Sequence, residues 1–271
     1  MLPLSSKASD SHLQNESTVF DQTFSWEAMI GISAFHNPHI IEGADQVTVS
    51  DWLNVSLFFD LYYKGFFIQS NHMRADSLLY GAEFGYQLVV EPEWQLDVLV
   101  RSYLPAYELT YHIQDNTTSQ QYTYLSETDE GQGLGLRFSR YFDQAVMSID
   151  VAALEPVSES KGWVVDWYYN KLVHHRNWDI YVGGGLTYYS KATLNHYLSP
   201  KISPQYTDIE YHPDNSGLRA QVEILARYPI NKKWLFNAGI NQNYYNSGFT
   251  NSPLVEKNFI TRVQLGVVYV F

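Results

Sequence analysis

The feature that most constrains the fold is an alternation of apolar and polar residues that recurs along most of the chain. In "GLRAQVEILARY", residues 217–228, every second side chain is apolar or aromatic, whereas Arg219, Glu223 and Arg227 fall between them. Alternate side chains of a β-strand point to opposite faces, so the pattern predicts a strand with one apolar face. The closing segment, "NFITRVQLGVVYVF", repeats the pattern and ends on Phe271. The apolar face must be covered by a protein core or by a lipid bilayer.

About twelve segments carry this alternation, and the links between them are alternately short and long. The segments lie at about 26–36, 53–63, 66–72, 78–88, 94–101, 131–142, 145–155, 163–173, 178–189, 217–228, 234–246 and 259–271. The long polar links include 107–130 and 190–215. A soluble sandwich has no need for such an alternation, whereas outer-membrane barrels keep short turns in the periplasm and long loops outside. We therefore expect an all-β fold, a single antiparallel transmembrane β-barrel of about 12 strands in a bacterial outer membrane.

Composition supports a membrane interface and excludes several function classes. The 271 residues include 22 Tyr, 14 Phe and 7 Trp, and such rings are favoured where water meets an apolar phase. Three tryptophans each follow a short turn and share the apolar face of their strand: Trp94, Trp178 and Trp234. This placement predicts an interfacial girdle. The net charge of -12 argues against nucleic-acid binding. The absence of cysteine excludes disulfides, thiolate metal sites and cysteine nucleophiles.

The strand positions between the apolar ones carry many charged residues, and these would face the inside of the predicted barrel. A barrel of this size has a lumen between the filled eight-strand and the open sixteen-strand cases. The charges either pair and fill the lumen or line a narrow, slightly cation-preferring pore, and we favour the paired network. The predicted lumen network comprises Arg101, Arg137, Arg219, Glu223, Arg227, Arg262, Asp60, Glu83, Asp97, Asp150, Asp166 and Asp179, together with Glu27.

The two ends of the chain carry separate predictions. The opening "MLPLSSKASDSHLQNES" has no apolar run of secretory-signal length, so we expect that an export signal has been removed. Residues 1–24 then form a periplasmic segment, and 25–271 form the barrel. The terminal alternation of Phe271, Tyr269, Val267 and Leu265 predicts a signal read by the outer-membrane assembly machinery. The barrel surface would contact outer-membrane lipid and lipopolysaccharide.

The C-terminal third also resembles a known family. The stretches "WDIYVGGGLTYYSKATLNHY", "SGLRAQVEILARYPINKKWLFNAGINQNYYNS" and "NSPLVEKNFITRVQLGVVYVF" are similar to the MltA-interacting protein (MipA/OmpV) outer-membrane family. Tyr228-Pro229 with Trp234, and the loop 251–255, match the family's hairpin and loop motifs. The resemblance implies a non-enzymatic scaffold between a murein transglycosylase and a murein synthase. The alternative is a narrow small-solute channel.

No motif indicates catalysis, a cofactor or a metal. Most of the nine histidines fall in predicted loops or turns, and no Ser–His–acid spacing supports an outer-membrane lipase or protease, which is the less favoured reading. The acidic cluster Glu127, Asp129 and Glu130 matches no calcium loop, and solvated loop charge explains it better. We therefore expect no catalytic residues, no cofactor-binding residues and no metal ligands.

Overall fold

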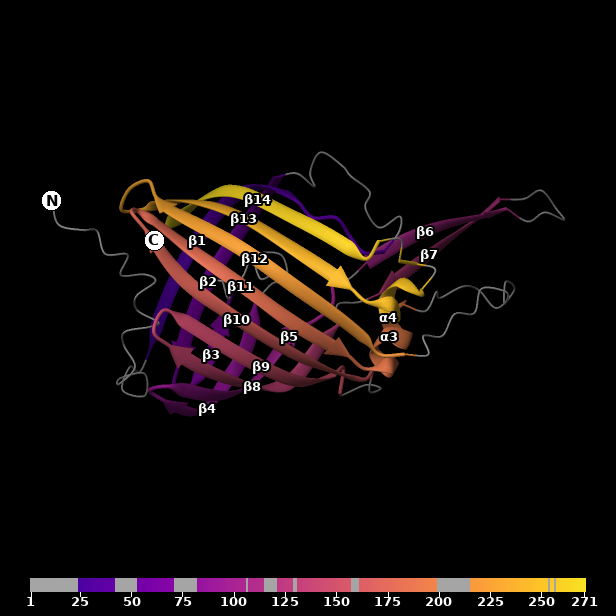
Figure 1. Ribbon diagram of the computed structural model, residues 1–271, viewed down its shortest axis with the longest axis horizontal. Coiled ribbons are helices and arrows are strands. Elements are labelled where there is room, and N and C mark those ends of the chain that lie inside the picture. The colour runs from indigo at the N-terminus through magenta and orange to yellow at the C-terminus, as the bar shows by residue number, and fades with distance from the viewer. Residues whose placement is uncertain are drawn as a thin grey trace.

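The chain folds into a closed antiparallel barrel of twelve strands, with a separate two-stranded hairpin (Figure 1). The computed structural model describes residues 24–41, 53–70, 82–105, 107–114, 121–128, 131–156, 161–198, 215–252, 254–255 and 257–271, with the backbone alone for 107–128 and Asn54. Each barrel strand pairs with its sequence neighbour, except that β5 pairs with β8 across the hairpin and β1 closes on β14. The predicted fold class is confirmed.

The barrel strands are mostly 9 to 13 residues long. They are β1 (Ser25–His36), β2 (Leu53–Tyr63), β3 (Phe66–Gln69), β4 (Glu83–Glu91), β5 (Trp94–Ser102), β8 (Gln132–Phe142), β9 (Ala145–Leu154), β10 (Trp163–His175), β11 (Trp178–Tyr189), β12 (Gly217–Pro229), β13 (Trp234–Tyr245) and β14 (Phe259–Val270). The hairpin is formed by β6 (Tyr107–Gln114) and β7 (Gln121–Thr128), and two helices, α3 (Lys191–Leu198) and α4 (Ser247–Thr250), lie in the long links.

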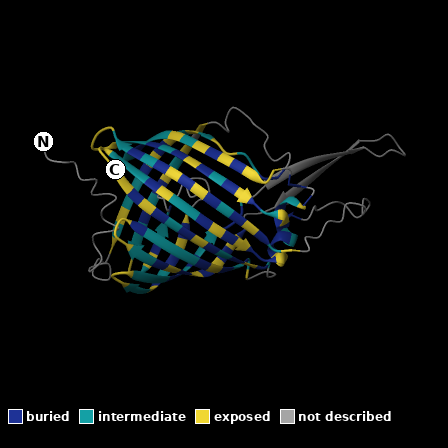
Figure 2. Cartoon of the chain, viewed as in Figure 1, coloured by how far each residue is buried: buried dark blue, intermediate teal, exposed yellow. Residues whose placement is uncertain are grey.

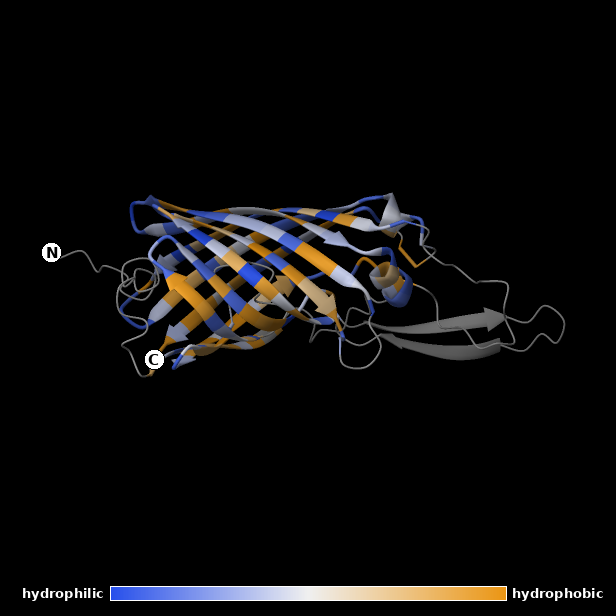
Figure 3. Ribbon diagram, turned by 90° about the horizontal axis from the view of Figure 1, so that it is seen from below, coloured by the Kyte–Doolittle hydropathy of each residue, from blue (hydrophilic) through white to orange (hydrophobic). Residues whose placement is uncertain are grey.

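Burial follows the predicted parity along the strands. On β12, Val222 and Ile224 are exposed, whereas Gln221, Glu223 and Leu225 are buried. Figure 2 shows exposed and buried positions alternating over the barrel wall, and Figure 3 shows apolar and polar positions alternating in the same way. The exposed apolar side chains form the outer face, so the inner face carries the polar residues. This inside-out arrangement is that of a barrel surrounded by lipid.

Short turns join the strands at the end of the barrel where the C-terminus lies (Figure 1). At the β2–β3 turn, Lys64 and Gly65 both have positive φ angles, 49° and 86°. Two consecutive positive φ values define the tight turn whose twist suits an antiparallel hairpin, and glycine adopts the second without strain. We assign this end to the periplasm and the end that carries α3, α4 and the hairpin to the cell exterior, following the general rule for such barrels.

The structure corrects several details of the sequence reading. Strand β3 covers Phe66–Gln69 and β4 begins at Glu83, and residues 71–72 and 78–81 of the expected strands lie outside the described residues. The stretch 107–130, expected to be a polar loop, contains hairpin β6–β7 in an eight-residue antiparallel register. The stretch 190–215 contains helix α3, which packs against the barrel mouth. Within the described ranges, no helix is long and apolar enough to span a membrane.

Candidate functional site in the barrel lumen

A row of polar side chains crosses the inner wall from β5 to β12. Strand register places Asp97 opposite Arg137, Arg137 opposite Asp150, and Asp150 opposite Asp166. The row continues through Thr187 to Arg219. Paired residues of neighbouring antiparallel strands project from the same face, so these side chains meet within the lumen.

Arg137 is the centre of this row. Its guanidinium donates from Nε to Oδ1 of Asp150 at 2.7 Å and from Nη1 to Oε2 of Glu83 at 2.6 Å. Its Nη2 donates to both carboxylates at 2.8 and 3.1 Å. All three residues are buried. Arginine presents its donors in a planar fork, and a doubly bidentate arrangement of this kind is the geometry in which a buried ion pair is most strongly held.

Two further arginines extend the network on either side. Arg101 donates from Nη1 to Oδ2 of Asp150 at 3.1 Å, and its Nη2 lies 3.6 Å from a carboxylate oxygen of Asp166. Arg219 donates to Oγ1 of Thr187 at 3.1 Å, and Thr187 in turn donates to Asp166 at 2.6 Å. Glu83, Asp150 and Asp166 are thus matched by Arg101, Arg137 and Arg219. This balance keeps desolvated charge paired within the wall.

A second cluster surrounds Glu223. The hydroxyl of Tyr168 donates to Oε1 of Glu223, and Nδ2 of Asn241 donates to Oε2 at 2.9 Å. Tyr168 reaches across β11 at Gly183, where a methyl group would lie 2.6 Å from the Tyr168 hydroxyl oxygen. The glycine-rich run of β11 therefore makes room for a side chain that links β10 to β12.

The remaining residues of the predicted network lie outside these two clusters, except for Asp97, which lies opposite Arg137 in the row. Asp60 accepts from the backbone N–H of Ser70 at 3.1 Å, and Asp97 accepts from Gln95 at 2.7 Å. Asp179 lies at the periplasmic rim, where it pairs with exposed His174 at 2.7 Å. The other members are Arg227, whose guanidinium lies 5.3 Å from the ring centre of Tyr181, and Arg262 and Glu27, which lie on β14 and β1.

Sequence reasoning missed the uncharged members of the lumen network. Tyr103, just beyond the end of β5, donates its hydroxyl to Asp150 at 3.2 Å and lies 4.7 Å from the Arg101 guanidinium. Thr187 donates to Asp166 on the neighbouring strand β10, and Tyr168 donates to Glu223 two strands away on β12. The alternation along the strands could have indicated both of these residues, because Tyr168 shares the inward face of β10 with Asp166 and Thr187 shares that of β11 with Gly183.

An apolar cluster lies at the exterior end of the barrel. Helix α3 contributes Leu194, Tyr197 and Leu198, which pack with Phe249 of α4 and with side chains from the strand ends. Ser252 donates to the carbonyl of Leu198 at 3.1 Å and so ties the two helical links together. We call this group the mouth cluster: Ile40, Ile41, Tyr103, Leu104, Ala152, Leu154, Val164, Tyr189, Leu194, Tyr197, Leu198, Tyr245, Phe249, Leu254, Val255 and Ile260.

His39 lies beside the mouth cluster and is held neutral. Its Nδ1 accepts a hydrogen bond from the backbone N–H of Ile41 at 3.0 Å. Burial, and then the positive charge of Arg262, lower the pKa of His39 to about 4. The imidazole is therefore uncharged at neutral pH, as its acceptor role at Nδ1 requires.

The three tryptophans that follow short turns lie on the outer surface near the periplasmic end. Trp94 stacks on Phe138, with ring centres 6.0 Å apart. Trp178 lies 5.0 Å from Tyr228, and Trp234 lies 5.2 Å from Tyr269. Each contact joins neighbouring strands, and their role as an interfacial girdle stays a prediction. Phe271 is 69% exposed at the same end.

Within the described residues, no group of three or more His, Asp or Glu side chains is arranged to hold a metal ion. Asp129 and Glu130 of the acidic cluster lie outside these residues, as does the side chain of Glu127.

A closed barrel with an apolar outer wall, a paired polar lumen and short turns at one end defines an outer-membrane β-barrel protein. More particularly, the chain belongs to the MltA-interacting protein MipA family, whose model matches residues 30–271. No curated protein matches the chain.

Solved structures similar to the chain are also outer-membrane barrels. OmpT of Vibrio cholerae is 7% identical, with a TM-score of 0.37, and 92% of this chain covers 97% of that one. The outer-membrane channel DcaP of Acinetobacter baumannii is 12% identical, with a TM-score of 0.40 and the same coverage. The KdgM porin is 9% identical, with a TM-score of 0.36, over 91% of this chain and 99% of that one. These are distant similarities of fold.

Proposed function

We propose that this MipA-family barrel is a non-enzymatic scaffold that holds cell-wall enzymes at the outer membrane, a murein transglycosylase and a murein synthase among them. The observation that supports the proposal best is the paired wall of the lumen: buried ion pairs join its strands, and the mouth cluster packs at its exterior end. A barrel stabilised in this way can serve as an anchor, with its periplasmic end available to a partner. The family is named for interaction with MltA, which supports a transglycosylase as that partner.

Two parts of the chain are candidates for docking. The first is the segment 1–24, of which residues 1–23 lie outside the described residues. The second is a basic surface on the periplasmic rim, formed by exposed His175 at the end of β10, Arg176 in the β10–β11 turn, and Lys232 and Lys233 in the β12–β13 turn. We call these four residues the basic rim.

The neighbouring part of the same rim, in the β8–β9 and β4–β5 turns, is acidic. Glu91, Glu93 and Asp143 are exposed there, although Arg140 pairs with Glu93 at 2.5 Å. Such separation of charge within one surface orients an approaching partner and speeds its association. We place segment 1–24 first as the docking element and the basic rim second.

Affinity capture from solubilised envelopes tests the scaffold. The full chain should retain a purified murein transglycosylase, and a chain lacking residues 1–24 should lose it. If the enzyme docks on the basic rim, the combined variant Arg176→Glu, Lys232→Glu and Lys233→Glu should lose capture while the chain lacking residues 1–24 keeps it. The matched control on the acidic side is Glu91→Lys with Glu93→Lys. Failure of the full chain to retain either cell-wall enzyme would reject the scaffold.

A narrow solute channel is the second candidate, because a hollow lies along the inner wall of β1, β2, β13 and β14. Single-channel recording of the purified barrel in planar bilayers separates the two functions. Steady conductance without enzyme capture would replace the scaffold by the channel.

A further inference from the structure

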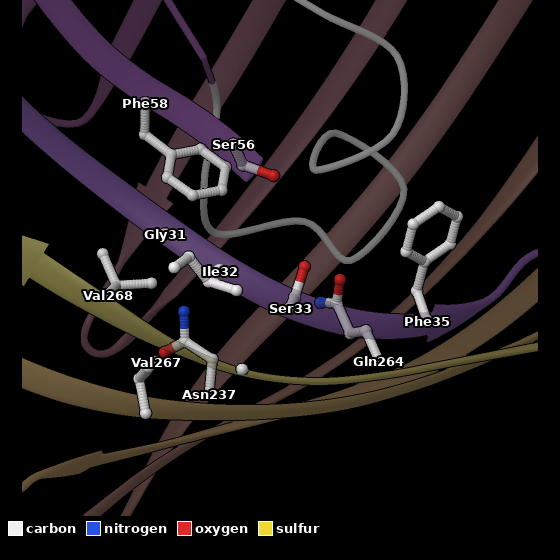
Figure 4. A pocket seen from close by; sticks show the side chains of 11 residues that line it. Gly31, Ile32, Ser33, Phe35, Ser56, Phe58, Asn237, Gln264, Val267 and Val268 are labelled. Carbon is white, nitrogen blue, oxygen red and sulfur yellow. The ribbon is translucent and has the colours of Figure 1, made fainter. Parts of the chain in front are cut away.

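The two faces of β14 offer different surfaces to a ligand. Its inward-facing Val268 packs with Met29 and Phe58. The hollow beside Phe58 and Val268, shown in Figure 4, has a volume of about 20 Å³, which is room for roughly one water molecule. The next residue, Tyr269, lies on the outward face together with exposed Leu265. A ligand larger than water therefore meets this part of the barrel from outside.

Aromatic rings form a strip over the outward face of β11–β14 at the periplasmic end. Neighbouring rings of the strip have their centres 5.0 to 6.2 Å apart. Such rings are favoured at the level of lipid headgroups, where an apolar phase meets water. We call these six residues the aromatic strip: Trp178, Tyr228, Trp234, Phe236, Tyr269 and Phe271.

Lys233, in the turn between β12 and β13, is held on this outward face. Its Nζ donates to the Tyr269 hydroxyl at 3.0 Å and lies 5.5 Å from the centre of the Tyr269 ring. The turn is fixed by Asn231, whose Oδ1 accepts from the backbone N–H groups of Lys233 and Trp234 at 2.9 and 3.1 Å. The ammonium is therefore placed at the membrane surface, beside the aromatic strip.

Three further basic side chains lie around the strip. Lys232 and Arg176 are exposed in two adjacent turns, β12–β13 and β10–β11. Lys171 is exposed on β10, on the outward face that it shares with Trp167 and Val173. A lysine on a lipid-facing wall extends its ammonium toward the headgroups. None of these three cations forms an ion pair with a carboxylate of the described residues, so each is available to an anion.

An anionic phospholipid matches this combination of rings and cations. Its phosphate lies at the level where Trp and Tyr rings are favoured, and each Lys or Arg near it strengthens the attraction. A zwitterionic phospholipid brings an ammonium of its own, and repulsion by the lysines lowers its affinity. A periplasmic protein approaches from beyond the membrane, whereas the Lys233 ammonium lies over the lipid-facing ring of Tyr269.

We propose that the outward face of β10–β14, at its periplasmic end, is a binding site for an anionic phospholipid of the periplasmic leaflet. Lys232 and Lys233 contact the phosphate, and Arg176 contacts it from the neighbouring turn. The acyl chains lie along the apolar wall, where exposed Val182 and Ile224 are paired on β11 and β12. The proposal does not depend on the scaffold function, and it leaves segment 1–24 as the docking element for cell-wall enzymes.

Lipid titration of the full chain in uncharged detergent micelles, read by mass spectrometry of the intact lipid-bound barrel, tests the site. Phosphatidylglycerol is the anionic probe, and phosphatidylcholine with the same acyl chains is its zwitterionic match. The parent should bind phosphatidylglycerol more tightly. Lys232→Gln with Lys233→Gln should weaken that binding about fivefold for each lysine and leave phosphatidylcholine binding unchanged.

The matched control is Lys191→Gln with Lys257→Gln, which removes the same charge from exposed positions at the exterior end and should bind as the parent does. The fold of each variant is checked by the heat-dependent change in its gel mobility, and Arg176→Gln replaces the lysine pair if that pair fails the check. Equal affinity of the parent for the two lipids would overturn the proposal, as would parent-like phosphatidylglycerol binding by the folded variant.

Two further outcomes would also overturn it. Glycerol 3-phosphate carries the same phosphate without acyl chains, and its competition with phosphatidylglycerol at equal concentration would show a site for free phosphate. Loss of enzyme capture by the lysine variant, with lipid binding unchanged, would assign the basic rim to a protein partner. Failure of the parent to capture an enzyme bears on the scaffold alone, because lipid binding is measured on the barrel by itself.

Discussion

Gly183 and Gly184 are adjacent residues with opposite surroundings. A methyl group on Gly183 would lie 2.6 Å from the Tyr168 hydroxyl oxygen, whereas one on Gly184 would meet nothing closer than 3.4 Å. We expect Gly183→Ala to lower the free energy of unfolding by about 1–3 kcal/mol through overpacking, and Gly184→Ala to have little effect. Urea unfolding in detergent micelles measures both, and equal losses would contradict the role given to Tyr168.

His39 makes the stability of the mouth depend on pH. The pKa of His39 is about 4 in the folded chain, and an unfolded histidine titrates near 6.5. The unfolded state thus binds more protons between these two values, so stability is full above about pH 6.5 and is lost as the pH falls toward 4. The loss amounts to at most about 3 kcal/mol.

The check compares urea midpoints at pH 7 and pH 4 for the parent, for His39→Asn and for His175→Asn. His39→Asn should reduce the dependence on pH, and His175→Asn, a change at the exposed end of β10, should leave it as in the parent. Identical pH dependence in all three would remove His39 as the cause.

Helix α3 packs at the exterior mouth of the barrel, where it can limit access to the lumen. Leu194 and Leu198 are fully buried in the mouth cluster, whereas Ala192 on the same helix is exposed. The variant Leu194→Glu with Leu198→Glu should displace the helix, because unpaired charge is costly in an apolar cluster. We expect this variant to have a higher single-channel conductance than the parent in planar bilayers. The control Ala192→Glu should have the same conductance as the parent. A conductance equal to the parent's would mean that α3 is not the barrier.

The barrel strands could be predicted from sequence, but helix α3 in a long link could not. Period-two alternation is local, so the segments around 217–228 and 259–271 reveal both strand and face without knowledge of their neighbours. Helix α3, "KATLNHYL", lies within a polar stretch, and its buried face depends on Phe249 and Tyr189 from elsewhere in the chain. In hairpin β6–β7, "YELTYHIQ" alternates apolar or aromatic residues with polar ones, so its strand pattern is present in the sequence and was missed because 107–130 was interpreted as a polar link.

The sequence predicts which residues face the lumen, but it does not predict which of them pair. Inward parity placed Arg137 and Asp150 on one wall, yet it could not show that Asp179 pairs with His174 at the rim instead. Pairing depends on register across strands, which turn lengths and long links set together.

At the scale of the whole molecule, the last strand closes the barrel. Phe271 is exposed, its backbone N–H donates to the carbonyl of Ala28 at 3.2 Å, and its ring lies 5.1 Å from that of Tyr269. We expect removal of Phe271, or its replacement together with Tyr269 by serine, to block membrane assembly. Phe259→Ser, at the opposite end of the strand on the same face, is the control. A folded, heat-modifiable Phe271 variant in outer-membrane fractions would refute the assembly signal.

The orientation of the barrel in the membrane is also testable. Protease added to whole cells should cut within 107–130 or 190–215 and spare the β12–β13 turn at 231–233, because the long links face outward. Cleavage at that turn from outside would reverse the topology.

The ion pairs of the lumen also bear on the order of events in folding. Glu83 and Arg137 are 54 residues apart in sequence, and Tyr168 and Glu223 are 55 apart, so neither contact can form within a single hairpin. Contacts between distant segments form late, because the loop they close must first lose its entropy. Until β4 meets β8 through β5, these groups have only water as a partner. The nascent barrel must therefore remain hydrated inside while its outer face already meets lipid, and expulsion of that water becomes the step that locks the wall.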